Sequence, residues 1–151
     1  LAKIVQRCRD LPGEELFRYV DSNRKRQLVS SDDVNAYLRE LTDREITAKD
    51  FRTWGGTMLA AVELRRLGPA ASRREADRNV IAAIDAVAER LGNTRAVCRK
   101  YYVHPALLQA YLLGHIVPQP PALARRARRK QPGAALRRDE VLVLQFLQER
   151  V

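Results

Sequence analysis

Apolar residues recur every three or four positions along most of the chain, which is the spacing of amphipathic helices. The pattern predicts helices over 1–11, 30–41, 47–67, 72–91, 95–102, 105–114 and 140–150. Only the stretch "LFRYV" at 16–20 suggests a brief extended segment. The chain is therefore expected to be mainly α, with short connections.

Polar residues mark where several of these helices begin and end. Ser30 with Asp33, and Thr47 with Asp50, have the spacing of a capping box, which predicts two helix starts. Gly68 and Gly92 each follow an apolar periodic run and predict two helix ends.

The helix predicted from Thr47 combines an apolar face with an arginine and two glycines. The expected face consists of Phe51, Trp54, Met58, Ala61 and Val62. Arg52 lies about 100° around the helix from its neighbour and leaves this face, one turn before Gly55 and Gly56. A glycine inside a helix costs about 1 kcal/mol relative to alanine, so the pair indicates close approach by another backbone or a ligand. Alternatively, Arg52 is an ordinary surface residue beside a glycine pair that only packs helices.

Two adjacent tyrosines follow a basic pair in "LGNTRAVCRKYYVHP". A tyrosine beside cations can act as a nucleophile, although most tyrosines pack at the edge of an amphipathic helix. Neighbouring helical residues diverge by about 100°, so Tyr101 and Tyr102 cannot both face one site. Asn93, after Gly92, is by itself most simply a cap or turn residue.

Composition adds a polyanionic partner to this picture. The 151 residues are 46% hydrophobic and carry 28 basic against 18 acidic residues, a net charge of +10. Such a balance favours nucleic acid, although a soluble protein with surplus arginine is the alternative. Two cysteines indicate a reducing compartment, and the sequence has neither a CxxC motif nor a histidine cluster for a metal. It also lacks an apolar run near 18 residues, so we expect no membrane span.

A basic, proline-flanked segment precedes the last predicted helix. Between residues 122 and 138 the chain has seven basic residues and no acidic one. We expect a mobile linker over 118–138 that contacts DNA phosphates, or else a merely solvated tail. The helix in 139–151 is expected to dock through Val141, Leu144 and Leu147. The expected phosphate contacts of the linker are Arg125, Arg126, Arg128, Arg129 and Lys130.

Four motifs, in this order along residues 1–115, resemble the type IB DNA topoisomerases of the small bacterial and poxvirus-like form: "LPGEELFRYVD", "DVNAYLRE", "ITAKDFRTWGGT" and "LGNTRAVCRKYYVHP". The resemblance implies the multi-helical catalytic domain that these topoisomerases share with the tyrosine recombinases, a fold of DNA breaking and rejoining enzymes. It makes residues 1–117 the C-terminal part of that domain, truncated at its N-terminus.

The resemblance also assigns roles to single residues. Arg52 would contact the scissile phosphate, and Asn93 would donate to a non-bridging oxygen in place of the more usual histidine. Tyr102, nine residues beyond Asn93, would be the nucleophile, with Tyr101 packed beside it. Family members touch the DNA backbone at the positions of Lys49, Arg99 and Lys100.

The activity implied is relaxation of supercoiled double-stranded DNA through a 3′-phosphotyrosine intermediate, without ATP, metal or cofactor. We expect a monomer in the cytoplasm, associated with the nucleoid. The family also uses a second arginine and a lysine general acid that this chain lacks, which leaves open whether the fragment acts alone.

Two other interpretations compete with a topoisomerase. Tyrosine recombinases share the fold and the tyrosine spacing, but they usually have histidine at the positions of Lys49 and Asn93. Both differences favour the topoisomerase. A non-catalytic, basic helical DNA-binding module is the second alternative, and covalent attachment to DNA would distinguish it from an enzyme.

Overall fold

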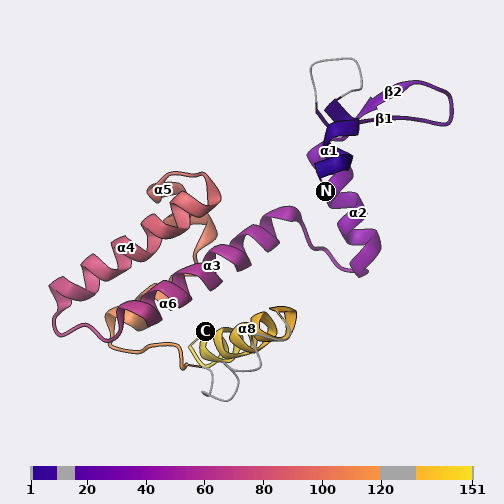
Figure 1. Ribbon diagram of the computed structural model, residues 1–151. Coiled ribbons are helices and arrows are strands. Elements are labelled where there is room, and N and C mark those ends of the chain that lie inside the picture. Colours follow the sequence, from indigo (N-terminus) through magenta and orange to yellow (C-terminus); the bar gives the residue numbers. More distant parts are fainter. Residues whose placement is uncertain (1, 10–15, 120–131, 151) are drawn as a thin grey trace. The chain divides into compact units, whose positions relative to one another are not determined.

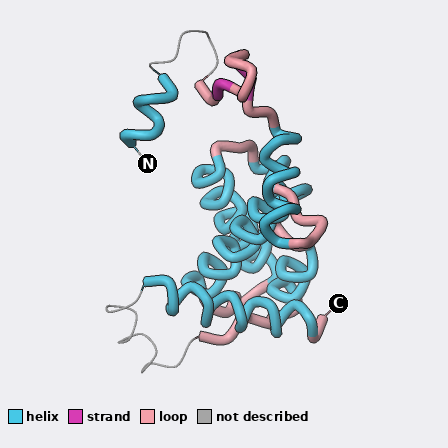
Figure 2. Tube along the Cα trace, turned by 90° about the vertical axis from the view of Figure 1, so that its right-hand side faces the viewer, coloured by secondary structure: helices cyan, strands magenta, loops and turns pink. Residues whose placement is uncertain are grey.

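The computed structural model describes residues 2–9, 16–119 and 132–150, and most of these are helical (Figure 2). The expectation of a mainly α fold is confirmed. The chain divides into two compact units, Leu1–Asp50 and Phe51–Val151. The catalytic domain expected over 1–117 stays a prediction. None of the described helices has the length and apolar character needed to cross a membrane.

The first unit contains α1 (Ala2–Arg9), a hairpin of β1 (Arg18–Val20) and β2 (Arg26–Leu28), and α2 (Ser31–Thr42) (Figure 1). The strands are antiparallel, and Tyr19 lies opposite Gln27. The extended segment predicted at 16–20 is confirmed at β1, whereas its partner strand was not predicted.

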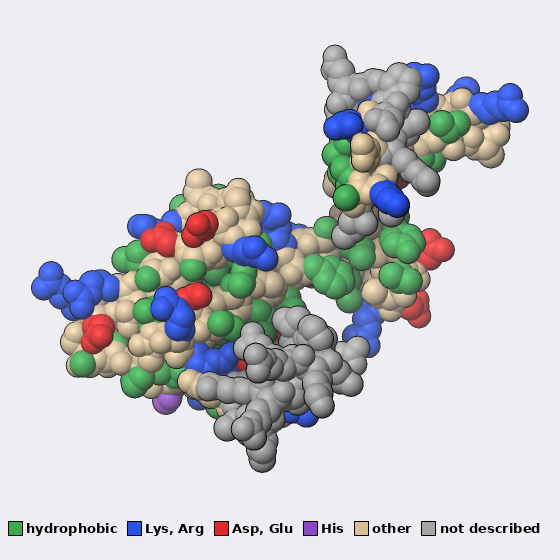
Figure 3. All heavy atoms as spheres, in the orientation of Figure 1, with side chains coloured by type: hydrophobic (Ala, Val, Ile, Leu, Met, Phe, Trp, Pro, Cys, Tyr) green, Lys and Arg blue, Asp and Glu red, His purple; other side chains and the backbone are tan. Residues whose placement is uncertain are grey.

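The hairpin turn is organised by the carboxylate of Asp21. Its oxygens accept hydrogen bonds from the backbone N–H groups of Asn23 and Lys25 and from the side-chain amide of Gln27. These hydrogen bonds lower the pKa of Asp21, and the bond from the Gln27 side chain has the largest effect. Arg24 at the turn has φ of 59°, in the left-handed region that non-glycine residues rarely adopt. Lys and Arg side chains cluster at this end of the hairpin (Figure 3).

The first predicted capping box is confirmed, and the second forms only in part. The Ser30 hydroxyl accepts from the Asp33 N–H, and the Asp33 carboxylate accepts from the Ser30 N–H, which completes the box at the start of α2. At the start of the next helix only half of the predicted box forms: the Asp50 carboxylate accepts from the N–H and hydroxyl of Thr47, while the Asp50 N–H donates to the Thr47 carbonyl and not to its hydroxyl. In both places the aspartate satisfies an N–H donor that a helix start leaves without a partner.

Helix α3 begins at the end of the first unit, at Ala48, and continues into the second unit. The other helical elements of the second unit are α4 (Arg73–Leu91), α5 (Arg95–Val97), the π-helical turn η1 (Cys98–Tyr102), α6 (Pro105–Leu112) and α8 (Pro132–Gln148). α4 contacts α5, η1 and α6. Helix α3 spans Ala48–Leu67 and ends at Gly68, as predicted. The centre of the core is formed by Ala60, Leu64, Ala83, Ile84, Val87, Leu107 and Val143.

The predicted apolar face of α3 was wrong at two positions. Phe51 and Val62 are 56% and 39% exposed. The buried stripe instead includes Gly56 and Thr57, with Met58, Ala60, Ala61 and Leu64. Small side chains dominate this stripe, because neighbouring segments approach the α3 backbone closely there. Hydrophobicity alone therefore misplaced the buried face.

The C-terminal helix begins earlier than predicted. α8 starts at Pro132, a residue suited to the first helical position, so the expected linker over 118–138 overlaps a helix. Residues 120–131, with the five expected phosphate contacts, lie outside the described residues. The docking residues were also wrong in part: Val141 and Leu144 are exposed, and the buried residues are Val143, Phe146 and Leu147.

Side chains of α3 form hydrogen bonds with α8 and with the segment that follows α6. The Arg65 guanidinium donates to the Asp139 carboxylate at 2.8 Å and to the Pro118 carbonyl at 3.1 Å. The Trp54 indole N–H donates to the Glu140 carboxylate at 3.3 Å. Helix α8 is thus packed within the second unit.

Candidate active site

Arg52 lies on the exposed side of α3, and its guanidinium reaches the end of α4. One of its terminal nitrogens donates a hydrogen bond to the backbone carbonyl of Leu91, at 2.5 Å. This carbonyl belongs to the last turn of α4, where carbonyl groups have no partner within the helix. A helix end, and not a carboxylate, therefore orients the arginine.

Asn93 brings a second donor to the same carbonyl. Gly92 ends α4 with φ of 63°, a conformation that glycine adopts without strain. The chain then folds back, and the Asn93 side-chain amide donates to the Leu91 carbonyl at 2.9 Å. Asn93 is a turn residue, as one interpretation held, and it also places an N–H donor beside Arg52.

Tyr102 completes this group from the end of η1. The Arg52 guanidinium carbon lies 5.1 Å from the centroid of the Tyr102 ring, within the range of a cation–π contact. Tyr102 is half-buried, whereas Tyr101 is 46% exposed and has the Lys100 ammonium 5.0 Å from its ring centroid. The two tyrosines differ in surroundings as expected, and Tyr102 is the one beside Arg52.

Gly56 explains how α3 and Tyr102 come so close. A Cβ atom added at Gly56 would lie only 2.3 Å from the Tyr102 carbonyl oxygen, a separation that no side chain tolerates. The prediction that a glycine marks close approach by another backbone is confirmed at Gly56. At Gly55 an added Cβ would meet no atom within 4 Å, so no other backbone approaches there, and close approach by a ligand stays a prediction.

Comparison with known proteins places this chain in a family. The sequence model of "Eukaryotic DNA topoisomerase I, catalytic core" matches residues 1–113, a range that contains Arg52, Asn93 and Tyr102. The chain belongs to the type IB DNA topoisomerases. A DNA topoisomerase 1B from Acanthamoeba polyphaga mimivirus is 33% identical over 108 residues, which cover 67% of this chain. The chain spans about a third (32%) of the length of that relative.

This result favours the topoisomerase interpretation over the tyrosine recombinase. The expectation of a bacterial member stays a prediction, because the relative named above is viral. The roles of Arg52, Asn93 and Tyr102 also stay predictions, although the structure brings the three residues together.

Cys98 is a nucleophilic group in the same turn of this topoisomerase chain, and it is fully buried. Burial raises the pKa of its thiol, and the positive charge of Arg52 offsets this only in part. A buried, protonated thiol is a poor nucleophile. Tyr102 is therefore the better candidate for attack on a phosphate.

The expected DNA-backbone contacts are surface residues. Arg99 and Lys100 are exposed in η1, next to Tyr102. Lys49 is exposed on α3, three residues before Arg52, and belongs to the first unit. Their contact with DNA stays a prediction.

Sequence reasoning missed the Leu91 carbonyl, which accepts hydrogen bonds from Arg52 and Asn93. It also missed the hydroxyls of Thr53 and Thr57, which bond to the backbone on either side of Tyr102. The glycine stop at Gly92 could have indicated that the last carbonyls of α4 need outside donors. The two threonines flank Gly56 along the same helix face, and this spacing was the available signal.

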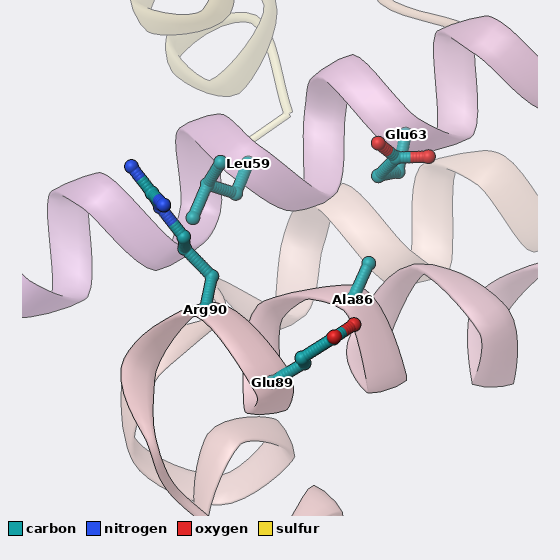
Figure 4. A pocket seen from close by; sticks show the side chains of 5 residues that line it. All are labelled: Leu59, Glu63, Ala86, Glu89 and Arg90. Carbon is teal, nitrogen blue, oxygen red and sulfur yellow. The ribbon is translucent and has the colours of Figure 1, made fainter.

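A groove lies between α3 and α4 (Figure 4). It is lined by Leu59, Glu63, Ala86, Glu89 and Arg90. Two carboxylates make it unsuited to a phosphate, and none of the predicted site residues lines it. Within the described residues, no three or more histidine, cysteine, aspartate or glutamate side chains gather in a way that could hold a metal ion.

Proposed function

We propose that the protein containing this chain relaxes supercoiled double-stranded DNA by breaking and rejoining one strand at a time. The observation that carries the proposal is the convergence of Arg52, Asn93 and the Tyr102 ring around the end of α4. Membership of the topoisomerase family supports it.

In the proposed first step, the Tyr102 oxygen attacks a backbone phosphorus atom in line with the 5′ oxygen. A bond from phosphorus to the tyrosine oxygen forms as the bond to the 5′ oxygen breaks. The phenol loses a proton and the departing 5′ oxygen gains one, so the products are a 3′-phosphotyrosine and a free 5′-hydroxyl. The reverse step reseals the strand. The new ester retains the energy of the phosphodiester bond, so neither ATP nor a metal is required.

Arg52 and Asn93 act on the negative charge that builds on the phosphate oxygens in the transition state. A guanidinium offers a rigid pair of donors that matches two phosphate oxygens, and the amide of Asn93 adds a neutral donor. In the chain without DNA, both donate to the Leu91 carbonyl. We infer that a phosphate oxygen takes the place of this carbonyl when DNA binds.

Asn93 cannot carry a proton, because an amide does not titrate near neutral pH. The proton for the departing 5′ oxygen must therefore come from another group. The resemblance assigns the role of proton donor to a lysine, and it implies a second arginine as a further member of the site; neither has a match in this chain. The proposed activity thus belongs to a protein that supplies these groups.

The positive charge of the chain is the second support for a DNA substrate. A net charge of +10 attracts the duplex and releases counterions from it. We propose that Lys49, Arg99 and Lys100 contact the DNA backbone, that the protein acts as a monomer, and that it resides with the nucleoid in the cytoplasm.

The test is capture of the covalent intermediate. The protein, expressed at its natural length, is mixed with duplex DNA labelled at either end of one strand and denatured with detergent. We expect a covalent adduct that retains the 5′-labelled portion of the strand, and peptide mapping should place the DNA on Tyr102. Binding without any adduct would contradict the proposal and favour the non-catalytic DNA-binding module.

A further inference from the structure

Thr57 is the one buried polar or charged residue among those whose burial the structure describes, with 1% of its surface exposed. Its hydroxyl donates to the Thr53 carbonyl at 2.9 Å and accepts from the His104 backbone N–H at 3.0 Å. A buried hydroxyl without hydrogen-bond partners is destabilising, so these two bonds determine the position of the Thr57 side chain relative to residue 104. Thr57 thereby fixes the chain two residues after Tyr102.

Thr53 makes the matching contact on the other side of Tyr102. Its hydroxyl donates to the Tyr101 carbonyl at 3.1 Å. Between the two threonines, the Tyr102 carbonyl oxygen lies against Gly56, where only glycine leaves room for it. Three positions on one face of α3 therefore hold the backbone of 101, 102 and 104.

The backbone conformation around Tyr102 explains why hydrogen bonds from α3 are needed there. The π-helical turn η1 ends at Tyr102, and Val103 is extended, with φ of −122° and ψ of 127°. The last carbonyls of such a turn and the first N–H groups of the next helix lack helical partners. The Tyr101 carbonyl and the His104 N–H are two of these groups, and hydroxyls from α3 satisfy both.

We propose that Thr53 and Thr57 are positioning residues, which orient Tyr102 relative to Arg52 through the backbone on either side of the tyrosine. Arg52 and Thr53 are neighbours on α3, so one short stretch of helix sets both the phosphate donor and the nucleophile. Both hydroxyls bond to backbone groups of the protein. This inference rests on the proposed function, because the position of Tyr102 matters only if Tyr102 attacks the phosphate.

The expected effect is on rate and not on binding. In-line attack depends steeply on geometry, and a displacement of about 1 Å can cost 10²-fold in rate. In the protein at its natural length, Thr53→Val and Thr57→Val remove a hydroxyl while keeping the side-chain shape. Single-turnover cleavage at saturating duplex should fall about 10–100-fold, with duplex affinity unchanged. Thr53→Ser and Thr57→Ser, which restore the hydroxyl, should recover most of the rate.

Tyr111→Phe is the matched control. The Tyr111 hydroxyl donates to the Gly68 carbonyl at 2.6 Å and accepts from the Asn79 amide at 2.8 Å, in the same unit but away from 101–104. Its removal should lower the thermal midpoint and leave the cleavage rate unchanged. If the valine variants behave like this control, the threonines are merely structural and the inference is wrong. Should Thr57→Val fail to fold, Thr53→Val decides, because Thr53 is only half-buried.

A spectroscopic measurement separates this inference from the proposed function. In fluorotyrosine-labelled protein without DNA, Thr53→Val should shift or broaden the ¹⁹F resonance of Tyr102 and leave that of Tyr37 unchanged. An unmoved Tyr102 resonance would overturn the positioning role even if the enzyme cleaves DNA. Absence of a covalent adduct from the unsubstituted protein would instead refute the proposed function, while a shifted resonance would still support the positioning of Tyr102.

Discussion

The Arg52 guanidinium lies over the Tyr102 ring, 5.1 Å from its centroid, while it also bonds to the end of α4. We predict that Arg52→Ala lowers single-turnover cleavage by about 10²–10⁴-fold with little loss of duplex affinity, because its charge acts mainly on the transition state. Arg52→Lys keeps the charge but not the paired donors, so it should recover only part of the rate. An Arg52→Ala variant that loses binding but cleaves normally at saturating DNA would count against this role.

The tyrosine pair provides an internally controlled test. We predict that Tyr102→Phe abolishes the covalent adduct and that Tyr101→Phe retains it, since the Tyr102 ring lies beside Arg52 whereas the Tyr101 ring lies beside Lys100. Detergent trapping with labelled duplex measures both variants at equal protein concentration. The opposite pattern would move the nucleophile to Tyr101.

The basic segment before α8 is predicted to strengthen binding without affecting chemistry. Each cation that neutralises a duplex phosphate adds about 0.9 to the log–log salt slope. Replacement of the five phosphate contacts expected over 125–130 by glutamine should flatten the slope by up to about 4 units, with single-turnover cleavage at saturating DNA nearly unchanged. An unaltered salt slope would mean that the basic segment is only a solvated tail. A large loss of the single-turnover cleavage rate would mean that the basic segment packs against the segment that contains Tyr102.

The hairpin turn contains a correctable strain. Arg24 has φ of 59°, which costs a non-glycine residue roughly 1–2 kcal/mol. We predict that Arg24→Gly stabilises the first unit by about 0.5–1 kcal/mol, because relief of this strain exceeds the added chain entropy of glycine. Urea unfolding and hydrogen exchange of the hairpin amides measure the change. Arg24→Ala removes the same charge without relieving φ, so an equal gain from alanine would refute the explanation.

Helix ends were the most predictable part of the fold, because their signals are local. The Ser30–Asp33 box and the Gly92 stop depend on neighbouring backbone groups, and both appear as expected. The buried face of α3 was less predictable, because burial depends on what packs there. Phe51 is exposed and Thr57 buried, since small residues admit the backbone of 102–104.

The site was predictable as a set of residues and not as a geometry. Motif spacing selected Arg52, Asn93 and Tyr102, which the structure brings together. The atom that joins the first two is the Leu91 carbonyl, and a backbone atom has no signature in sequence. The start of α8 was missed because basic side chains suggested a linker, while Pro132 is compatible with a first helical turn.

The contacts of α8 with α3 also determine the order of events during synthesis. Trp54 and Glu140, or Arg65 and Asp139, can meet only after the ribosome has made everything between them. Translation proceeds at about 5–20 residues per second, so the segment with Arg52 and Tyr102 emerges some seconds before Val143 and Phe146 complete its core. During that interval the nascent chain exposes apolar surface, which makes the delay between α6 and α8 a vulnerable period for misfolding and chaperone binding.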